Sequence, residues 1–350
     1  MKIEPRTKIS KTMVYLAPLL AIFFTIVGGG LLFAILGKNP FLALYTFFIA
    51  PISSLDGLSE LFVKATPLIL VGVGLSFGFK ANVWNIGAEG QLTIGAICGS
   101  VLPLVFYNVD SIFLLPFMLF SAVLGGMMWA AIPAILKDRF NTNEILTSLM
   151  LTYVGLLILS VLIHGPMKDP DGMNFPESRL FHESALLPVI ISGTRLHAGF
   201  LIVLLVVISS WIAFGRHIIG FQIKVIGMAP RAASFAGFSQ KKIIWISFMI
   251  AGGCAGLAGI FEVAGPLGQV VPSISPGYGF TAIIVAFVGR LHPVGIFFSG
   301  LVVALTYLGG ENAQIDMNMP SAVTGVFQGM LLFFLLASDI LIRHRIRFRK

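Results

Sequence analysis

Charged side chains are scarce in this sequence of 350 residues, where aspartate, glutamate, lysine and arginine together make up 11%. A soluble domain carries roughly a quarter of such residues. Hydrophobic residues make up 57%, and the mean hydropathy is +0.96. A water-soluble fold has no interior large enough for so much apolar surface, so a bilayer must act as the solvent. The composition therefore excludes a soluble protein and predicts an all-α, polytopic membrane protein.

Several chemical signatures are also missing. The two cysteines, Cys98 and Cys254, lie far apart in apolar runs, so neither a disulfide framework nor a metal site is predicted. The sequence has no H-E-x-x-H pattern and no G-x-x-x-x-G-K-[ST] loop to cradle phosphates. Gly74–Gly78 spells G-x-S-x-G, but inside an apolar run, where a nucleophile elbow does not form. We expect a chain that is not an enzyme and that binds no cofactor itself.

The charges that are present mark out the topology. The net charge is +8, but the basic residues lie between apolar runs rather than in a patch with aromatics, so no nucleic-acid partner is expected. Apolar runs of roughly 17–25 residues cross a bilayer, and we count about ten. With both ends in the cytoplasm, 18 of the 23 lysines and arginines fall inside, as the positive-inside rule requires. The sequence thus predicts one membrane domain in the plasma membrane over residues 12–342, with a cytoplasmic N-terminus (1–11) and a basic cytoplasmic tail (343–350).

Two of the ten runs, Ala65–Phe79 and Thr281–Gly289, are short, and each adjoins a polar, glycine-rich interruption. The first interruption is Lys80–Gln91, and the second leads through Pro272–Phe280. Paired broken segments are the best sequence indication of a transport site between two repeated halves. We therefore predict two discontinuous segments, two pseudo-repeated halves and a pathway near six residues: Trp84, Asn85, Glu89, Gln91, Tyr278 and Phe280.

Four of these residues, and one loop, have a second interpretation. Glu89 either touches the transported molecule or caps backbone N–H groups at the start of a half-helix, where a carboxylate is favoured. The aromatic rings of Trp84, Tyr278 and Phe280 either stack on a planar ligand or simply pack. The outer segment Gly165–Leu196, with four prolines, is either a plain linker or a docking surface.

The longest inner loop, Arg216–Lys242, has five basic residues and no acidic one. Within it Pro230 suits the first position of a helix and Gly237 its end, which predicts a short helix. That helix either lies in the lipid interface or docks a cytoplasmic partner. The candidate docking residues are Pro230, Arg231, Ala232, Ala233, Phe235 and Gly237, and the loop Lys137–Glu144 could assist them.

The segment Asn85–Gln91 reads N-I-G-A-E-G-Q and resembles the signature of permease subunits of ABC importers in the branched-chain amino acid and simple-sugar group. The nucleoside branch, of guanosine type, is the most similar. Supporting matches are Ala65–Leu68, Gly277–Phe280 and Gly289–Gly295, and Pro230–Gly237 resembles the coupling helix of the family.

The resemblance implies a ten-span subunit that pairs with a second, homologous permease. It further implies a cytoplasmic ATP-binding subunit carrying ATP and Mg²⁺, an extracytoplasmic substrate-binding lipoprotein, and membrane lipid around the spans. Three functions stay open at this point: nucleoside import, import of a simple sugar or branched-chain amino acid by the same machinery, and ion-coupled secondary transport.

Overall fold

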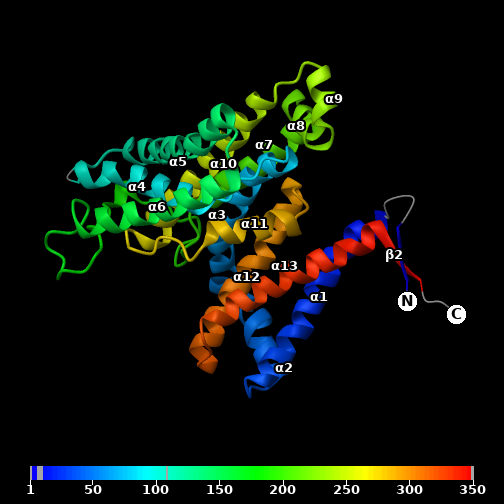
Figure 1. The fold of residues 1–350 in the computed structure, drawn as a ribbon. Helices are drawn as coiled ribbons and strands as arrows, with labels where there is room; N and C mark the ends of the chain where they lie inside the picture. The colour runs from blue at the N-terminus through cyan, green and yellow to red at the C-terminus, as the bar shows by residue number, and fades with distance from the viewer. Residues whose placement is uncertain (1, 6–10, 108, 348–350) are drawn as a thin grey trace. The chain divides into compact units, whose positions relative to one another are not determined.

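The computed structural model describes residues 2–5, 11–107 and 109–347, and the chain is almost entirely helical (Figure 1). Residues 6–10 of the predicted N-terminal segment and 348–350 of the predicted tail lie outside the described residues. The α-helices are α1 (Lys11–Ile35), α2 (Pro40–Leu44), α3 (Leu55–Lys80), α4 (Ala88–Val105), α5 (Leu114–Phe140), α6 (Glu144–His164), α7 (Gly199–Arg216), α8 (Ile218–Met228), α9 (Pro230–Phe235), α10 (Gln240–Glu262), α11 (Tyr278–Val288), α12 (Pro293–Met317) and α13 (Ala322–Arg343). Short π- and 3-10 helices are η1 (Tyr45–Ile49), η2 (Ala50–Ile52), η3 (Glu183–Ala185) and η4 (Val263–Leu267), and the two strands are β1 (Lys2–Pro5) and β2 (His344–Arg347).

Eight of these helices are long and apolar enough to cross a membrane, which confirms a multi-pass membrane protein. The other two predicted segments are α13 and the 11-residue α11. At 1.5 Å per residue, α11 reaches about 17 Å and cannot cross a hydrocarbon core of about 30 Å. The prediction that this segment is too short is confirmed. The internal repeat stays a prediction.

The expectation that Ala65–Phe79 is too short is wrong, because the helix that contains it, α3, has 26 residues. It extends back through Lys64, Glu60 and Asp56 to Leu55. Glutamate and lysine are good helix formers, and an aspartate in the first turn faces the positive end of the helix dipole. The charged residues that precede the apolar run therefore belong to the same helix.

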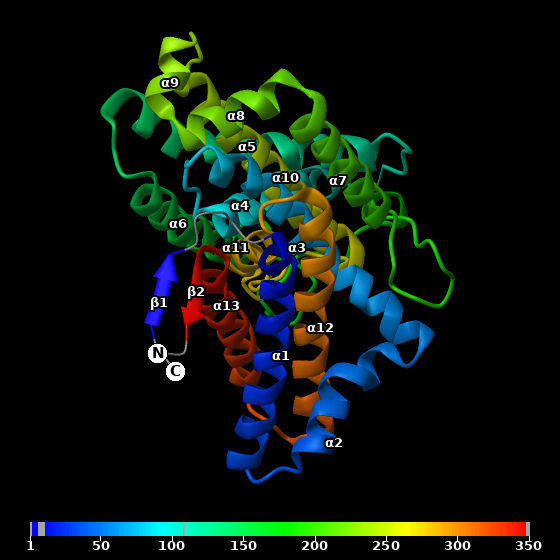
Figure 2. The same ribbon diagram turned by 90° about the vertical axis from the view of Figure 1, so that its right-hand side faces the viewer.

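The described chain forms two compact units, the first made of Met1–Leu61 and Val302–Lys350. In this unit α1 packs beside α13, and β1 pairs with β2 antiparallel, as Figure 2 shows. Three fully buried phenylalanines form its centre, with the rings of Phe47 and Phe327 stacked at 4.2 Å and Phe33 at 5.4 Å from Phe327. The unit thus joins the two ends of the chain through an aromatic core.

The second unit, Phe62–Leu301, is built on α4, α5 and α10, which lie side by side. Their backbones meet at small residues. A Cβ added to Gly95 would lie 2.1 Å from the Cα of Gly256, and one added to Gly126 would lie 2.1 Å from the carbonyl oxygen of Gly252. Small residues let membrane helices approach closely, since packing rather than hydrophobicity drives their association. This three-helix core supports the functional residues of the unit.

The outer segment Gly165–Leu196 is tied to the chain that precedes α11. Ser178 donates its backbone N–H to the carbonyl of Val270 (3.0 Å), and the Ser178 Oγ accepts from the Val270 N–H (2.9 Å). Gln269 donates to the Glu177 carboxylate (2.9 Å). The segment therefore packs against the membrane domain instead of hanging free, and its role in docking a partner stays a prediction.

Candidate functional site

The break between α3 and α4 is organised by two buried amides. Asn85 and Gln91 exchange hydrogen bonds between their side chains, at 2.9 and 3.1 Å. The Asn85 Oδ1 also accepts from the Gly87 N–H at 3.0 Å, one residue before α4 begins. Both amides are almost fully buried, and buried polar groups in membranes survive when they are paired. Asn85 and Gln91 thus fix the start of the helix.

Glu89 joins this start to the second interrupted segment. Its Oε2 accepts a hydrogen bond of 2.6 Å from the Gly279 N–H, 190 residues away in sequence. Beside it, the Ser275 hydroxyl accepts from the N–H groups of Gly277 (3.1 Å) and Tyr278 (2.8 Å). Free N–H groups and the helix dipole make a helix N-terminus a favourable place for an anion. The geometry at Glu89 is therefore that of a brace for the start of α11.

The first turns of α4 and α11 touch backbone to backbone. A Cβ on Gly279 would lie 2.3 Å from the Glu89 nitrogen. On its other side α4 meets α6: a Cβ on Gly90 would lie 2.7 Å from the Thr152 Cα, and the Ser148 hydroxyl accepts from the Ile86 N–H at 3.1 Å. The N-termini of both half-helices thus converge on one crowded junction.

The aromatic candidates are placed near this junction by packing. Trp84 stacks on Phe287 at 5.9 Å and lies 5.2 Å from Phe79, while its Nε1 donates to Asn82. Tyr278 is 4% exposed, and Phe280 is half-buried. The structure gathers residues of both predicted segments in one region. Contact of any of them with a transported molecule stays a prediction.

A substitution at Glu89 tests the brace. Glu89→Leu leaves the buried Gly279 N–H of α11 without its acceptor, at a cost of about 1–3 kcal/mol. We expect a lower midpoint of thermal unfolding and poor recovery of monodisperse protein, together with lost uptake. Glu89→Gln keeps an oxygen acceptor and should restore most of the stability. A Glu89→Leu protein that unfolds at the wild-type temperature but does not transport would instead indicate contact with the substrate.

The predicted short helix in the inner loop is confirmed as α9. Pro230 occupies its first turn, and the chain leaves it through Gly237, whose φ of +79° suits glycine. Ala233 is buried and attaches the helix to the unit, whereas Phe235 is 94% exposed. In Figure 1, α9 lies beside α8 at one end of the second unit. Arg231 on the same helix is exposed too, and the docking of a partner by these residues stays a prediction.

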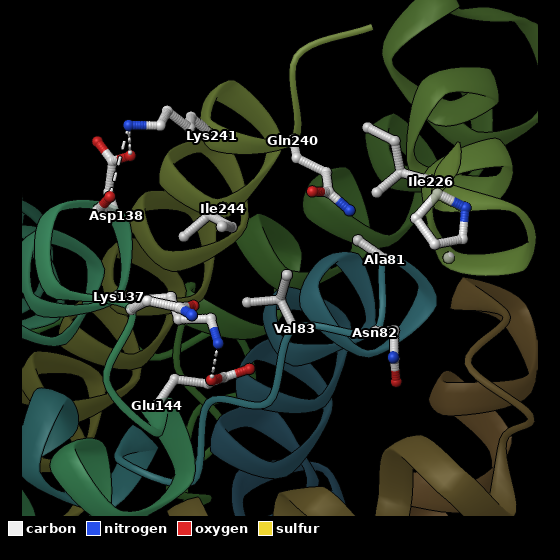
Figure 3. Close-up of a pocket in the computed structure, with 13 residues that line it drawn as sticks. Ala81, Asn82, Val83, Lys137, Asp138, Glu144, Ile226, Gln240, Lys241 and Ile244 are labelled. Atoms are coloured by element: carbon white, nitrogen blue, oxygen red, sulfur yellow. Dashed lines mark hydrogen bonds and ion pairs between the residues drawn. The ribbon is translucent and has the colours of Figure 1, made fainter. Parts of the chain in front are cut away.

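A pocket of about 520 Å³ opens beside α9 (Figure 3). Three segments that the sequence places on the inner side form it. They are the turn that follows α3, the α5–α6 loop, and the chain on both sides of α9. The residues that line it are Ala81, Asn82, Val83, Lys137, Asp138, Asn141, Glu144, Ile226, Gly227, Pro230, Gln240, Lys241 and Ile244. The loop Lys137–Glu144 thus lines the same pocket as Pro230 of α9, and its assistance to α9 stays a prediction.

Two ion pairs hold the walls of this pocket. Lys137 pairs with Glu144 at 2.9 Å across the α5–α6 loop, and Lys241 pairs with Asp138 at 2.9 Å, joining α10 to α5. The indole of Trp245 donates to the second Asp138 oxygen at 3.2 Å. Sequence reasoning missed the Asp138 cluster. Its only local signal is a lone aspartate between two cations, and its partners lie more than 100 residues away.

Comparisons with known proteins identify the family of the chain. Residues 57–336 match the family described as branched-chain amino acid transport system/permease component. A glucose ABC transporter permease of Haloferax volcanii is 34% identical over 99% of this chain and 93% of its own. A guanosine ABC transporter permease of Bacillus subtilis is 29% identical over 92% and 93% of the two chains. A nucleoside ABC transporter permease of Lactococcus lactis is 27% identical over 95% and 93%.

The family match covers most of the chain and excludes the ion-coupled secondary transporter that the broken helices alone left open. It agrees with the membrane helices, with the exposed α9 and with the absence of a phosphate-binding motif in the sequence. The chain belongs to the branched-chain amino acid transport system/permease component family and is a permease subunit of an ABC importer, a transport component rather than an enzyme.

Proposed function

We propose that this chain pairs with a second, homologous permease to form the path by which a nucleoside enters the cell. The observation that carries the proposal is α9, a six-residue helix whose Phe235 is 94% exposed beside a pocket of loops from the same end of the unit. A bare phenylalanine is unfavourable in water, and aromatic side chains are enriched at the energetic centres of protein interfaces. The helix is therefore suited to receive a moving partner.

That partner is a cytoplasmic ATP-binding subunit with ATP and Mg²⁺. When its halves close, movement enters through α9 and reaches α5 and α10 through the Lys241–Asp138 pair that lines the adjacent pocket. An extracytoplasmic lipoprotein delivers the substrate. The antiparallel pairing of β1 with β2 brings the two ends together, which supports placing both on one side of the plasma membrane.

The N-terminal ends of α4 and α11 line the proposed path. Glu89 anchors α11 to α4, and the Asn85–Gln91 pair anchors α4 to the turn before it. Because these polar groups satisfy one another, the path offers few free polar groups. A weak site is adequate when a separate protein captures the substrate first. Trp84, Tyr278 and Phe280 are the proposed pathway residues next to this brace.

The nucleoside assignment rests on two relatives, the guanosine and nucleoside permeases at 29% and 27% identity. A second candidate is a simple sugar, since the Haloferax volcanii glucose permease is 34% identical over nearly the whole chain. A branched-chain amino acid is the third, on the description of the family.

Uptake by the complete transporter distinguishes these substrates. In proteoliposomes with the cognate ATPase, second permease and binding protein, we expect uptake of labelled guanosine that excess unlabelled nucleosides suppress and that glucose and leucine leave unchanged. The control is the same complex with an ATPase inactivated at its phosphate-binding lysine, which should not transport. Uptake of labelled glucose but not guanosine would move the assignment to the sugar.

A further inference from the structure

A second pocket lies where α7 ends and α8 begins. Its volume is about 330 Å³, and it is lined by Phe214, Gly215, Arg216, His217, Ile218, Phe221 and Lys224. The lining combines an arginine, a lysine and a histidine with two aromatic rings, and it contains no carboxylate. The pocket is separate from the one beside α9, and neither the brace at Glu89 nor α9 uses it.

The cations in and beside this pocket have only neutral partners. Lys224 Nζ donates to the carbonyl of Phe214 at 3.1 Å, and Lys80 Nζ lies 3.6 Å from the centre of the Phe214 ring. Throughout the described part of the chain, no carboxylate pairs with Arg216, Lys224 or Lys80. A carbonyl or a ring stabilises a cation without cancelling its charge. A net positive field therefore remains at the pocket.

The charges of Lys80 and Lys224 also act on His292. Burial, and then the charges of Lys80 and Lys224, hold the pKa of the His292 imidazole below its ordinary value. The positive charges nearest the pocket are those of Arg216, Lys224 and Lys80.

The surroundings of the pocket are those of a membrane surface. Lys80 and Arg216 are the last residues of α3 and α7, both long enough to cross a bilayer. Phe221, which lines the pocket, is 54% exposed, and Trp211, five residues before Arg216 in α7, is 52% exposed. Uncompensated cations at the end of a membrane helix, next to exposed apolar side chains, match the two parts of a phospholipid, its phosphate and its acyl chains.

We propose that the pocket between α7 and α8 binds the headgroup phosphate of an anionic phospholipid, with Arg216 and Lys224 as the cations that hold it. The acyl chains lie against the exposed apolar side chains of α7 and α8, such as Trp211 and Phe221. A free phosphate would satisfy the same cations, but it would leave these apolar side chains uncovered. The lipid is therefore the source to which the structure points.

The test is native mass spectrometry of the full transporter purified in mild detergent, after addition of phosphatidylglycerol or phosphatidylcholine. We expect the complex to retain phosphatidylglycerol preferentially. Each cation near an anionic lipid contributes enough free energy for about a fivefold change in binding. Arg216→Gln and Lys224→Gln should each lower phosphatidylglycerol retention about fivefold, and the double variant about 25-fold.

The matched control is Lys242→Gln, which removes one exposed charge from the first turn of α10, away from the pocket. It should retain the lipid as the wild type does. Arg216→Gln keeps the test valid if Lys224→Gln, which also loses its bond to Phe214, folds poorly. Equal retention of the two lipids, unchanged retention in Arg216→Gln, or displacement of the lipid by millimolar glycerol 3-phosphate would each overturn the proposal.

Discussion

Gly279→Ala is expected to prevent assembly of a stable membrane domain. The added Cβ would lie 2.3 Å from the Glu89 nitrogen and 2.5 Å from the Glu89 Cα. Both are backbone atoms, so no side chain can turn aside to make room. Overpacking usually costs about 1–3 kcal/mol, and a clash between two main chains belongs above that range. The measurement is the midpoint of thermal unfolding in detergent, with the monodisperse fraction from size-exclusion chromatography.

The matched control for this variant is Gly329→Ala in α13, where an added Cβ has nothing within 4 Å. The same methyl group there should leave the unfolding midpoint and the elution profile as they are in the wild type. Wild-type behaviour of Gly279→Ala would show that α4 and α11 do not meet, and the brace at Glu89 would have to be abandoned.

Phe235→Asp is expected to abolish uptake while the chain still inserts into the membrane. The side chain is 94% exposed, so its replacement disturbs no packing within the chain. Loss of an aromatic centre of an interface costs about 2 kcal/mol or more, which is about 30-fold in affinity for the partner. The ATPase activity of the complex should fall to that of the free ATPase. Arg231→Asp, a charge reversal on the same helix, should act in the same direction.

Met173→Asp provides the control for this experiment. Met173 is 91% exposed in the segment Gly165–Leu196, so the substitution places the same charge at an equally exposed apolar position far from α9. Stimulation of the ATPase should stay at the wild-type value. Full stimulation and uptake in the Phe235→Asp complex would remove α9 as the coupling element.

Local features of the fold could be predicted from the sequence. The helix α9 follows from Pro230 at its start and Gly237 after its end, because both residues act through their own backbone geometry. The shortness of α11 follows from Gly289 and the prolines before it. The length of α3 could not be predicted in this way, because hydropathy marks where a helix is apolar rather than where it begins.

The partners of the polar residues could not be predicted, because they are distant in sequence. The two interruptions were identified as a pair, but the bond from the Gly279 N–H to Glu89 spans 190 residues, and no local pattern specifies it. The same holds for Asp138, whose contacts with Lys241 and Trp245 join two helices. Sequence periodicity indicates which residues are buried, while tertiary packing decides what each one meets.

The main-chain contacts among α4, α5 and α10 have a consequence for the tolerance of the chain to mutation. At Gly95 and Gly252 the neighbouring backbone occupies the space of a methyl group, so even an alanine displaces a whole helix. At Phe117 and Phe120, which are about 60% exposed, lipid can adapt to almost any apolar shape. A saturation library confined to apolar amino acids should therefore be depleted at these glycines and almost neutral at the phenylalanines. At these glycines, selection would preserve the small volume of the residue rather than its hydrophobicity.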